Sequence, residues 1–385
     1  MYTDKKIKKN TLRIGIDGRV LQEIKPSGIP HYALNIAREI IELDKQNEYI
    51  IFFNSFRKIE KEIPQIKGGN IEYKIYHFPN KLLEWLWKIV PYPKIDGLLD
   101  VDVFFSPHFI QIPLSKKVKK VVTIHDLSFL KNRKYFSWRK NFWHWQMNPK
   151  KICRHSEGII AVSNSTKRDL VKIYNINKDK IKVIHNGQRD TVEDFSREDE
   201  TETLKRMGLT NSSYLLFIAT LEPRKNIDGI IEAYALIHNK YPSAKLVIAG
   251  KKGWLFESIF KKVKKNKLEK MVFFTGFVSE KEKEILLKNA AAFIFPSFCE
   301  GFGIPVIEAK RHRIPIITSS VSSLPEIIKD AAILVNPHNT HDIAQAIKIV
   351  LNNYNMRNIL VSKSKKIDDF TWKDCAKETL DYLLC

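Results

Sequence analysis

Short runs of β-branched and aromatic residues alternate along the chain with longer segments of helical periodicity. The apolar runs are unbroken by polar residues, which is typical of strands that helices cover on both faces. In the segment at residues 226–238, large apolar side chains recur at steps of three and four, as on one face of a helix. This alternation predicts parallel sheets with crossover helices.

The expected strands fall into two groups. The first group lies at residues 12–16, 49–53, 101–105, 121–124, 158–162 and 181–184. The second group lies at residues 214–219, 245–249, 272–275, 292–295, 315–318 and 333–335. A polar, acidic stretch at residues 187–211 lies between them and is interpreted as a linker with a short helix. The pattern therefore predicts an α/β protein with two doubly wound domains, residues 1–190 and 191–369, and a last helix at residues 370–385.

Composition agrees with a globular chain. Of 385 residues, 44% are hydrophobic and 28% charged, which excludes wholesale disorder. No apolar run approaches the roughly 18 residues that span a bilayer. The four cysteines form no C-x-x-C pair and fit neither a disulfide framework nor a zinc site, so we expect free thiols in a reducing cytosol.

The net charge of +22 is unevenly distributed. Residues 1–190 contain 36 basic and 19 acidic residues, a net charge of +17, whereas residues 191–385 contribute only +5. A lysine-rich composition alone would raise both halves alike. The asymmetry predicts that the first half faces an anionic partner, such as nucleic acid, a phosphate-rich ligand or an anionic membrane.

The segment at residues 296–309 is the most informative motif. A strand ends near Pro296, two glycines follow, and Pro305 is placed to begin a helix. Such a loop offers free backbone N–H groups and the positive end of a helix dipole to an anion. Glu300 and Glu308 would lie roughly 10 Å apart, which suits a sugar and a ribose joined by diphosphate better than a water-activating pair. The alternative is a turn with a capping acid.

Basic residues follow another strand. Arg224 and Lys225 lie between a strand end and a helix start, where two cations oppose the helix dipole, so a phosphate between them is expected. A solvated loop is the alternative. His125 follows the strand at residues 121–124, a position at which a histidine is either structural or near chemistry. Residues 27–32, which include Gly28, are expected to form a loop before a helix at residues 33–41.

Other patterns do not support a site. Asp100 and Asp102 have D-x-D spacing but lie at the start of a strand, the wrong end for ligands in such sheets. The chain contains no G-x-x-x-x-G-K-[ST], H-E-x-x-H or G-x-S-x-G motif.

Taken in order, these motifs resemble the family 4 (group 1) retaining glycosyltransferases of the GT-B fold, over roughly residues 11–375. The resemblance rests on the E-x7-E segment, the residues after several strands and two short runs in the first half, at residues 161–165 and 183–187. It implies two Rossmann-like domains facing a cleft, a nucleotide sugar held by the second, an acceptor held by the first, and no metal or other cofactor. The last helix would return to the first domain.

The resemblance also implies roles for residues. Arg224 and Lys225 would hold the diphosphate, and Glu308 the ribose hydroxyls. Glu300, with the backbone of Phe302 and Gly303, would bind the donor sugar.

Further roles complete the implied site. Val278 lies where the base is contacted, and His125 would reach the donor sugar near the reaction centre. The helix start at Ile304 would stabilise the leaving diphosphate. Gly28 would let the backbone approach the phosphates, although Pro30, which has no N–H, departs from the family pattern.

The expected activity is transfer of a hexosyl unit to a saccharide or lipid-linked saccharide in surface polysaccharide synthesis. GDP-mannose is the first expectation for the donor and a UDP-sugar the second. Alternatives are another GT-B enzyme, such as a sugar-nucleotide epimerase or a phosphorylase, and, more distantly, a basic nucleic-acid-binding protein.

The basic first half includes an acid-free run at residues 131–155 in which basic and aromatic side chains are interleaved. This composition suits an anionic membrane surface or a lipid-diphosphate acceptor, and the alternative is a basic helix whose aromatics are core. We expect a cytoplasmic protein, peripheral on the inner face of the cell membrane.

Overall fold

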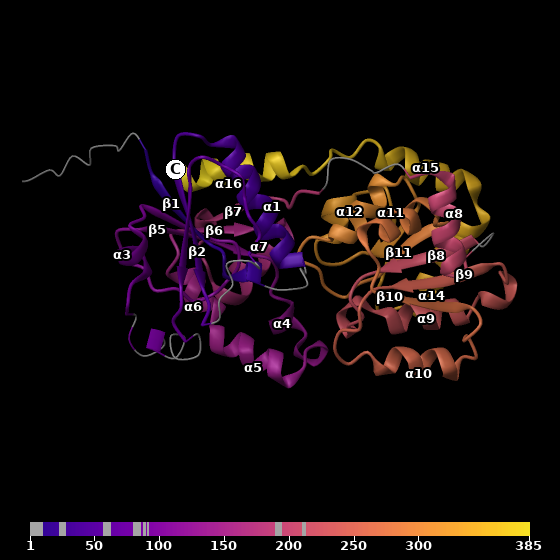
Figure 1. Ribbon diagram of the computed structural model, residues 1–385. Helices are drawn as coiled ribbons and strands as arrows, with labels where there is room; N and C mark the ends of the chain where they lie inside the picture. Colours follow the sequence, from indigo (N-terminus) through magenta and orange to yellow (C-terminus); the bar gives the residue numbers. More distant parts are fainter. Residues whose placement is uncertain are drawn as a thin grey trace, which may run out of the picture.

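The computed structural model describes residues 11–22, 28–56, 63–79, 86–87, 90, 92–188, 195–209 and 213–385. In these residues the chain forms two parallel sheets with helices packed on their faces, and the two units lie beside one another (Figure 1). The expected architecture, two Rossmann-like domains, is confirmed. None of the described helices is long and apolar enough to cross a membrane.

The first unit contains a 7-stranded sheet with the order β3-β2-β1-β4-β5-β6-β7. Its strands are β1 (Arg13–Asp17), β2 (Glu48–Asn54), β3 (Ile71–Tyr76), β4 (Val103–Ser106), β5 (Lys119–Ile124), β6 (Gly158–Ala161) and β7 (Ile181–Val183). Its helices are α1 (Gly28–Leu43), α3 (Ile95–Leu99), α4 (Ser128–Lys131), α5 (Trp138–Met147), α6 (Pro149–Arg154) and α7 (Asn164–Tyr174).

The second unit contains a 6-stranded sheet with the order β10-β9-β8-β11-β12-β13. Its strands are β8 (Ser213–Ile218), β9 (Ala244–Ala249), β10 (Val272–Gly276), β11 (Ala292–Phe295), β12 (Ile316–Ser319) and β13 (Ile333–Val335). The remaining helices are α8 (Arg197–Arg206), α9 (Ile227–Ala235), α10 (Glu257–Lys265), α11 (Glu280–Asn289), α12 (Ile304–Arg311), α13 (Leu324–Ile328), α14 (Thr340–Asn352), α15 (Tyr354–Ser364) and α16 (Trp372–Leu384). Short 3-10 turns lie at Arg19–Gln22, Arg133–Tyr135, Lys178–Lys180, Pro223–Lys225 and His238–Lys240.

The last helix, α16, leaves the second unit and packs against α1 of the first (Figure 1). Trp372, Cys375 and Leu383 are buried in the apolar cluster that α1 and the first sheet share. Lys119 at the start of β5 also donates a hydrogen bond to the carbonyl of Tyr382, at 2.8 Å. The C-terminal segment is therefore part of the first unit's core.

The chain crosses between the units at two adjacent places. The N–H of Gln188 donates to the carbonyl of Phe370 at 2.8 Å, and Gln188 pairs in parallel with Thr371. A Cβ on Gly187 would lie 2.4 Å from the backbone of Trp372, so only glycine allows this approach. The predicted boundary between residues 190 and 191 lies outside the described residues.

Three sequence expectations need correction. β3 was not expected, because it is an edge strand in which Glu72 and Lys74 interrupt the apolar pattern. The strand expected at residues 101–105 begins at Val103, since the Asp102 carboxylate accepts a hydrogen bond from the N–H of Arg13 in β1. The expected loop at residues 27–32 is largely helix, because α1 begins at Gly28.

The helical start explains Pro30. It lies in the first turn of α1, where a backbone N–H would have no intrahelical partner, so proline costs the helix nothing there.

Candidate active site

The carboxyl ends of the two sheets face one another across a cavity of about 1,210 Å³. Parallel sheets of this kind bind ligands at this edge. His125 and Asp126 follow β5 of the first sheet, Arg224 and Lys225 lie in the turn after β8, and Glu300 follows β11. All five residues line the cavity, so the strand ends singled out in the sequence meet in one place.

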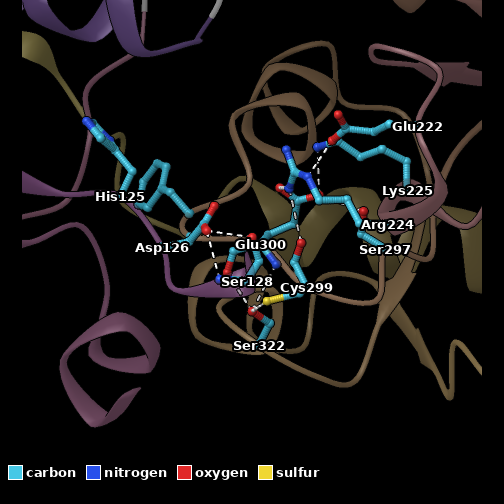
Figure 2. A network of polar contacts seen from close by, with 12 residues as sticks. His125, Asp126, Ser128, Glu222, Arg224, Lys225, Ser297, Cys299, Glu300 and Ser322 are labelled. Carbon is cyan, nitrogen blue, oxygen red and sulfur yellow. Dashed lines mark hydrogen bonds and ion pairs between the residues drawn. The ribbon is translucent and has the colours of Figure 1, made fainter. Parts of the chain in front are cut away.

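Arg224, Lys225 and Glu300 form one ion-paired group (Figure 2). The Lys225 Nζ lies 2.7 Å from Oε1 of Glu300, and Nη1 of Arg224 lies 3.1 Å from Oε2. Ser297 also donates its hydroxyl to Oε1, at 2.6 Å. Glu222 pairs with Nε of Arg224, so both carboxylates hold the guanidinium in one orientation.

These contacts determine the charge of the group. Burial alone would raise the pKa of Glu300, but Lys225, Arg224 and the hydrogen bonds outweigh it and lower that pKa. Burial disfavours the Arg224 cation, yet Glu300, Glu222 and Asp126 raise its pKa. Glu300 and Arg224 are therefore ionised at neutral pH, and Arg224 and Lys225 line the cavity.

Two serine hydroxyls hold the loop that carries Glu300 by hydrogen bonds. The hydroxyl of Ser322 donates to the carbonyl of Glu300 at 2.5 Å, and Ser323 donates to the carbonyl of Phe302 at 2.7 Å. Gly303, at a φ of 118°, turns the chain into α12, whose first residues, Ile304 and Pro305, line the cavity. The positive end of this helix thus faces the ligand space.

The two candidate loops touch directly. A Cβ on Gly301 would lie 1.9 Å from the carbonyl oxygen of His125, so glycine is required for the contact. Thr166, in α7, donates its hydroxyl to the carbonyl of His125 at 3.2 Å. The candidate loops of the two units are therefore in direct contact beside the cavity.

His125 is held in a neutral form. Its Nε2 lies 2.9 Å from the carbonyl of Pro107, which can only accept, so Nε2 carries the proton and Nδ1 has the lone pair. Burial lowers the pKa of His125, which the Pro107 carbonyl and Asp126 only partly offset. Tyr32 packs edge-on against the imidazole, with ring centroids 4.8 Å apart. The ring can position a substrate hydroxyl without adding charge.

Comparison with known proteins assigns the chain to a family. Residues 26–189 match the family "Glycosyltransferase Family 4" and residues 199–367 match "Glycosyl transferases group 1". The chain belongs to the family 4 glycosyltransferases. O-antigen chain mannosyltransferase B of Escherichia coli is 26% identical over 384 residues, which cover 92% of this chain and 95% of that protein.

Two further matches extend the comparison. The serotype-specific mannosyltransferase WbdA of E. coli is 30% identical over 261 residues, which cover 64% of this chain but only 32% of that longer protein. The crystal structure of Anabaena HepE in complex with UDP and glucose superposes with a TM-score of 0.73 over 97% of this chain and 99% of that one. At 16% identity, the HepE likeness shows the fold alone.

The glycosyltransferase cleft gathers most of the residues named from the sequence. His125, Arg224, Lys225, Glu300, Gly28, Phe302, Gly303, Ile304 and Glu308 line it. Val278 is not among the lining residues and packs against the core of the second unit. Glu308 lies in the cavity wall and is paired with Lys283 of α11, at 2.6 Å.

Other cavity residues were missed. Glu222 precedes the basic pair and Trp254 follows β9, so both lie near strand ends that the sequence analysis had already placed. Asp126 stands beside His125 and accepts from the N–H and hydroxyl of Ser128, at 2.9 and 2.6 Å. His108 follows β4 without a motif and could not have been found from the pattern.

The aromatic run of the first unit is largely solvent-exposed. On α5 the exposed fractions are 73% for Trp138, 50% for Phe142 and 74% for Trp145. For these three side chains the alternative that the aromatics are core is wrong, whereas Phe136 of the same run packs against a core cluster. The glycosyltransferase therefore presents an aromatic, basic helix beside its cleft.

Proposed function

We propose that the protein transfers a mannosyl unit from GDP-mannose to a saccharide or lipid-linked saccharide, with retention of anomeric configuration and without a metal ion, during synthesis of a surface polysaccharide. The observation that carries the proposal is the meeting of Arg224, Lys225 and Glu300 with His125 in one cleft. The mannosyltransferase names of the relatives favour this donor over a UDP-sugar.

The ion-paired group suits a leaving diphosphate. Breaking the sugar–phosphate bond develops negative charge on the diphosphate, which fixed donors stabilise without reorganisation. The Nε and Nη1 atoms of Arg224 are engaged, while Nη2 has no hydrogen-bond partner among the described residues. Together with Lys225 and the first turn of α12, this atom provides positive charge where a metal would otherwise be needed.

Glu300 suits binding rather than nucleophilic attack. Its carboxylate is held by two cations and a hydroxyl, and the lowered pKa of Glu300 reflects a stabilised anion. A carboxylate in this state is a weak nucleophile. We therefore assign Glu300, with the backbone of Phe302 and Gly303, to the donor sugar. Glu308 and Gly28, which also line the cavity, are assigned to the ribose and to the phosphates. The expected contact of Val278 with the base is not retained, because Val278 is not among the residues that line the cavity.

The acceptor and the membrane belong to the first unit in this proposal. Trp138, Phe142 and Trp145 are exposed on α5, and basic residues of the same run surround them. Exposed aromatic rings with cations are typical of helices that lie on anionic lipid. We assign this helix to the inner face of the cell membrane, where a lipid-linked acceptor would be presented.

A transfer assay tests the proposal. Purified protein is incubated with GDP-mannose and octyl α-D-mannopyranoside, and the products are identified by mass spectrometry and by the anomeric coupling in NMR. We expect GDP and an α-linked octyl dimannoside. An epimerised sugar nucleotide, a sugar phosphate formed only with inorganic phosphate, or salt-dependent oligonucleotide binding without any transfer would favour the alternative functions instead.

A further inference from the structure

Lys283 lines the cleft but is given no role by the motifs of the sequence. It lies in the first turn of α11, and the cavity wall also includes Glu280 and Glu308. The Nζ of Lys283 donates to Oε1 of Glu308 at 2.6 Å and lies 3.0 Å from Oε2 of Glu280. Lys283 thus connects α11 to the carboxylate of α12 that is assigned to the ribose.

The pair of Lys283 and Glu308 is sheltered from solvent but borders the ligand space. The exposed fractions of the two side chains are 14% and 19%, and both residues line the cavity. Burial alone would lower the pKa of Lys283, but Glu308 and Glu280 outweigh it and raise that pKa. Lys283 is therefore a cation at neutral pH, and it attracts Glu308 more strongly than an exposed lysine would.

One oxygen of the Glu308 carboxylate is left for a ligand. Oε1 accepts from Lys283, whereas Oε2 accepts no hydrogen bond from the described residues. A carboxylate oxygen has two lone pairs, and the adjacent 2′ and 3′ hydroxyls of a ribose can each donate to it. Because Lys283 already holds Oε1, the glutamate loses less rotamer freedom when a ribose binds.

The contact between α11 and α12 does not depend on Lys283 alone. Glu284, the next residue of α11, is 3% exposed and is paired with Arg311 at the end of α12. Its Oε2 also lies 3.0 Å from Nε2 of His312. This more deeply buried group joins the same two helices, so loss of the Lys283 cation should leave the helices in place.

We infer that Lys283 is a positioning residue: it holds the Glu308 carboxylate where the ribose hydroxyls donate to it, and so makes the cleft select ribonucleotides over nucleotides that lack these hydroxyls. The inference rests on the proposed function, because it presumes that Glu308 binds the ribose. Lys283 acts only through Glu308 and does not itself contact the nucleotide.

Nucleotide binding without transfer tests the inference. The dissociation constants of GDP and 2′,3′-dideoxy-GDP are measured by titration calorimetry, and their ratio is the readout. Both nucleotides carry the same diphosphate, so the ratio cancels any effect of a lost charge that they share. We expect the wild type to prefer GDP by about tenfold, and this preference to fall at least about threefold in Lys283→Met. An unchanged ratio in a folded Lys283→Met variant overturns the inference.

A double variant shows whether Lys283 acts through Glu308. Glu308→Gln should lower the ratio, and Lys283→Met added to it should lower the ratio no further, because residues that act as one unit are not additive. A further loss in the double variant would mean that Lys283 contacts the ribose directly, which also overturns the inference.

Two more variants separate positioning from structure. Lys283→Arg keeps a cationic donor and should retain more of the preference than Lys283→Met. The matched control is Lys281→Met, on the same helix but outside the cavity lining, where Lys281 donates to Asp199 at 2.5 Å. Its ratio should equal that of the wild type, with the thermal midpoint recorded for every variant.

The outcomes distinguish this inference from the proposed function. The ribose is common to all ribonucleotides, so if UDP binds more tightly than GDP, the comparison is made with 2′,3′-dideoxy-UDP. A loss of preference in Lys283→Met would then support the inference, while the GDP-mannose assignment fails. Mannosyl transfer by a wild type that binds GDP and its dideoxy form equally would overturn the inference and leave the proposed transfer standing.

Discussion

Lys225 is held by the same carboxylate that it neutralises, so its Nζ is in place before any substrate arrives. Such pre-positioned donors act at full strength in the transition state, and removing one typically costs roughly 3–4 kcal/mol of barrier. We predict that Lys225→Ala lowers kcat for mannosyl transfer by about 10²- to 10³-fold.

The matched control is Lys363→Ala, which removes a lysine paired with Asp330 at 2.9 Å on the surface of the second unit. Its kcat should equal that of the wild type. Because Lys225→Ala also leaves Glu300 buried without one cation, its thermal midpoint should fall too. Turnover near the wild-type value in a folded Lys225→Ala variant would remove Lys225 from the diphosphate site.

His144 makes stability depend on pH. Burial lowers its pKa from 6.5 to about 4, with Lys140 adding to this effect and Asp126 opposing it. As pH falls from 6.5 towards 4, His144 binds a proton in the unfolded chain but not in the folded protein. The free energy of unfolding therefore decreases. We predict a lower thermal midpoint at pH 5 than at pH 7, and a smaller difference in His144→Phe, which keeps the stack on Phe129. Identical pH slopes would contradict the assignment.

At the scale of elements, the loop after β11 approaches the loop after β5 closely, at the contact of Gly301 with His125. A Cβ 1.9 Å from a carbonyl oxygen forces the loops apart. Because a 1 Å misplacement of reacting groups can cost about 10²-fold, Gly301→Ala should lower transfer by a factor of that order. Gly97→Ala, with nothing within 4 Å of the added Cβ, is the control. Unchanged kinetics in Gly301→Ala would show that the cleft does not need this approach.

The exposed face of α5 gives an element-scale prediction about lipid. Flotation with vesicles that contain anionic lipid should carry the wild-type protein, and the double variant Trp138→Ala/Trp145→Ala should float several-fold less. Tyr354→Ala serves as the control for loss of an exposed aromatic. Binding that is the same with and without anionic lipid, or independent of both tryptophans, would exclude α5 as a membrane contact.

The sequence predicted the elements well where burial was complete. Strands such as β8 and β11, covered on both faces, read as unbroken apolar runs and were placed within a residue or two. β3 was not predicted because an edge strand is only partly buried, so its sequence mixes polar and apolar residues. The start of α1 escaped because a glycine and a proline look like a turn, although both are accepted in a first helical turn.

The site was predicted less completely, for a physical reason. Position after a strand identified Arg224, Lys225 and Glu300, since topology brings such residues to one edge. Which carboxylate pairs with which cation depends on side-chain directions that no spacing encodes. His108 could not be predicted, because its distinguishing feature is a buried Nδ1 without a hydrogen-bond partner among the described residues, and that feature exists only in the folded protein.

At the scale of the whole molecule, the cations of the cleft are provided by the chain itself. We predict that GDP raises the thermal midpoint more than UDP or ADP does, because GDP-mannose is the proposed donor. A ligand that binds only the folded state stabilises that state, by about 2.7 kcal/mol at a concentration of 100 Kd. EDTA should change neither this shift nor the transfer rate. A rate that EDTA abolishes and Mg²⁺ or Mn²⁺ restores would refute metal independence.

The paired crossings at Gln188 and Thr371 have a mechanical consequence. The two crossings are bonded to each other, and Phe370 packs against an apolar cluster to which both units contribute, so the units are joined along one side of the cavity. In Figure 1 the α16 crossing lies along the upper edge, while α5 and α10 lie at the lower edge. Trp254, between β9 and α10, donates its Nε1–H to the carbonyl of Tyr135, which precedes α5, at 2.6 Å. Because Trp254 lines the cavity, this bond must break before the units can part at this side, so we expect the product nucleotide to leave past Trp254 after the bond has opened.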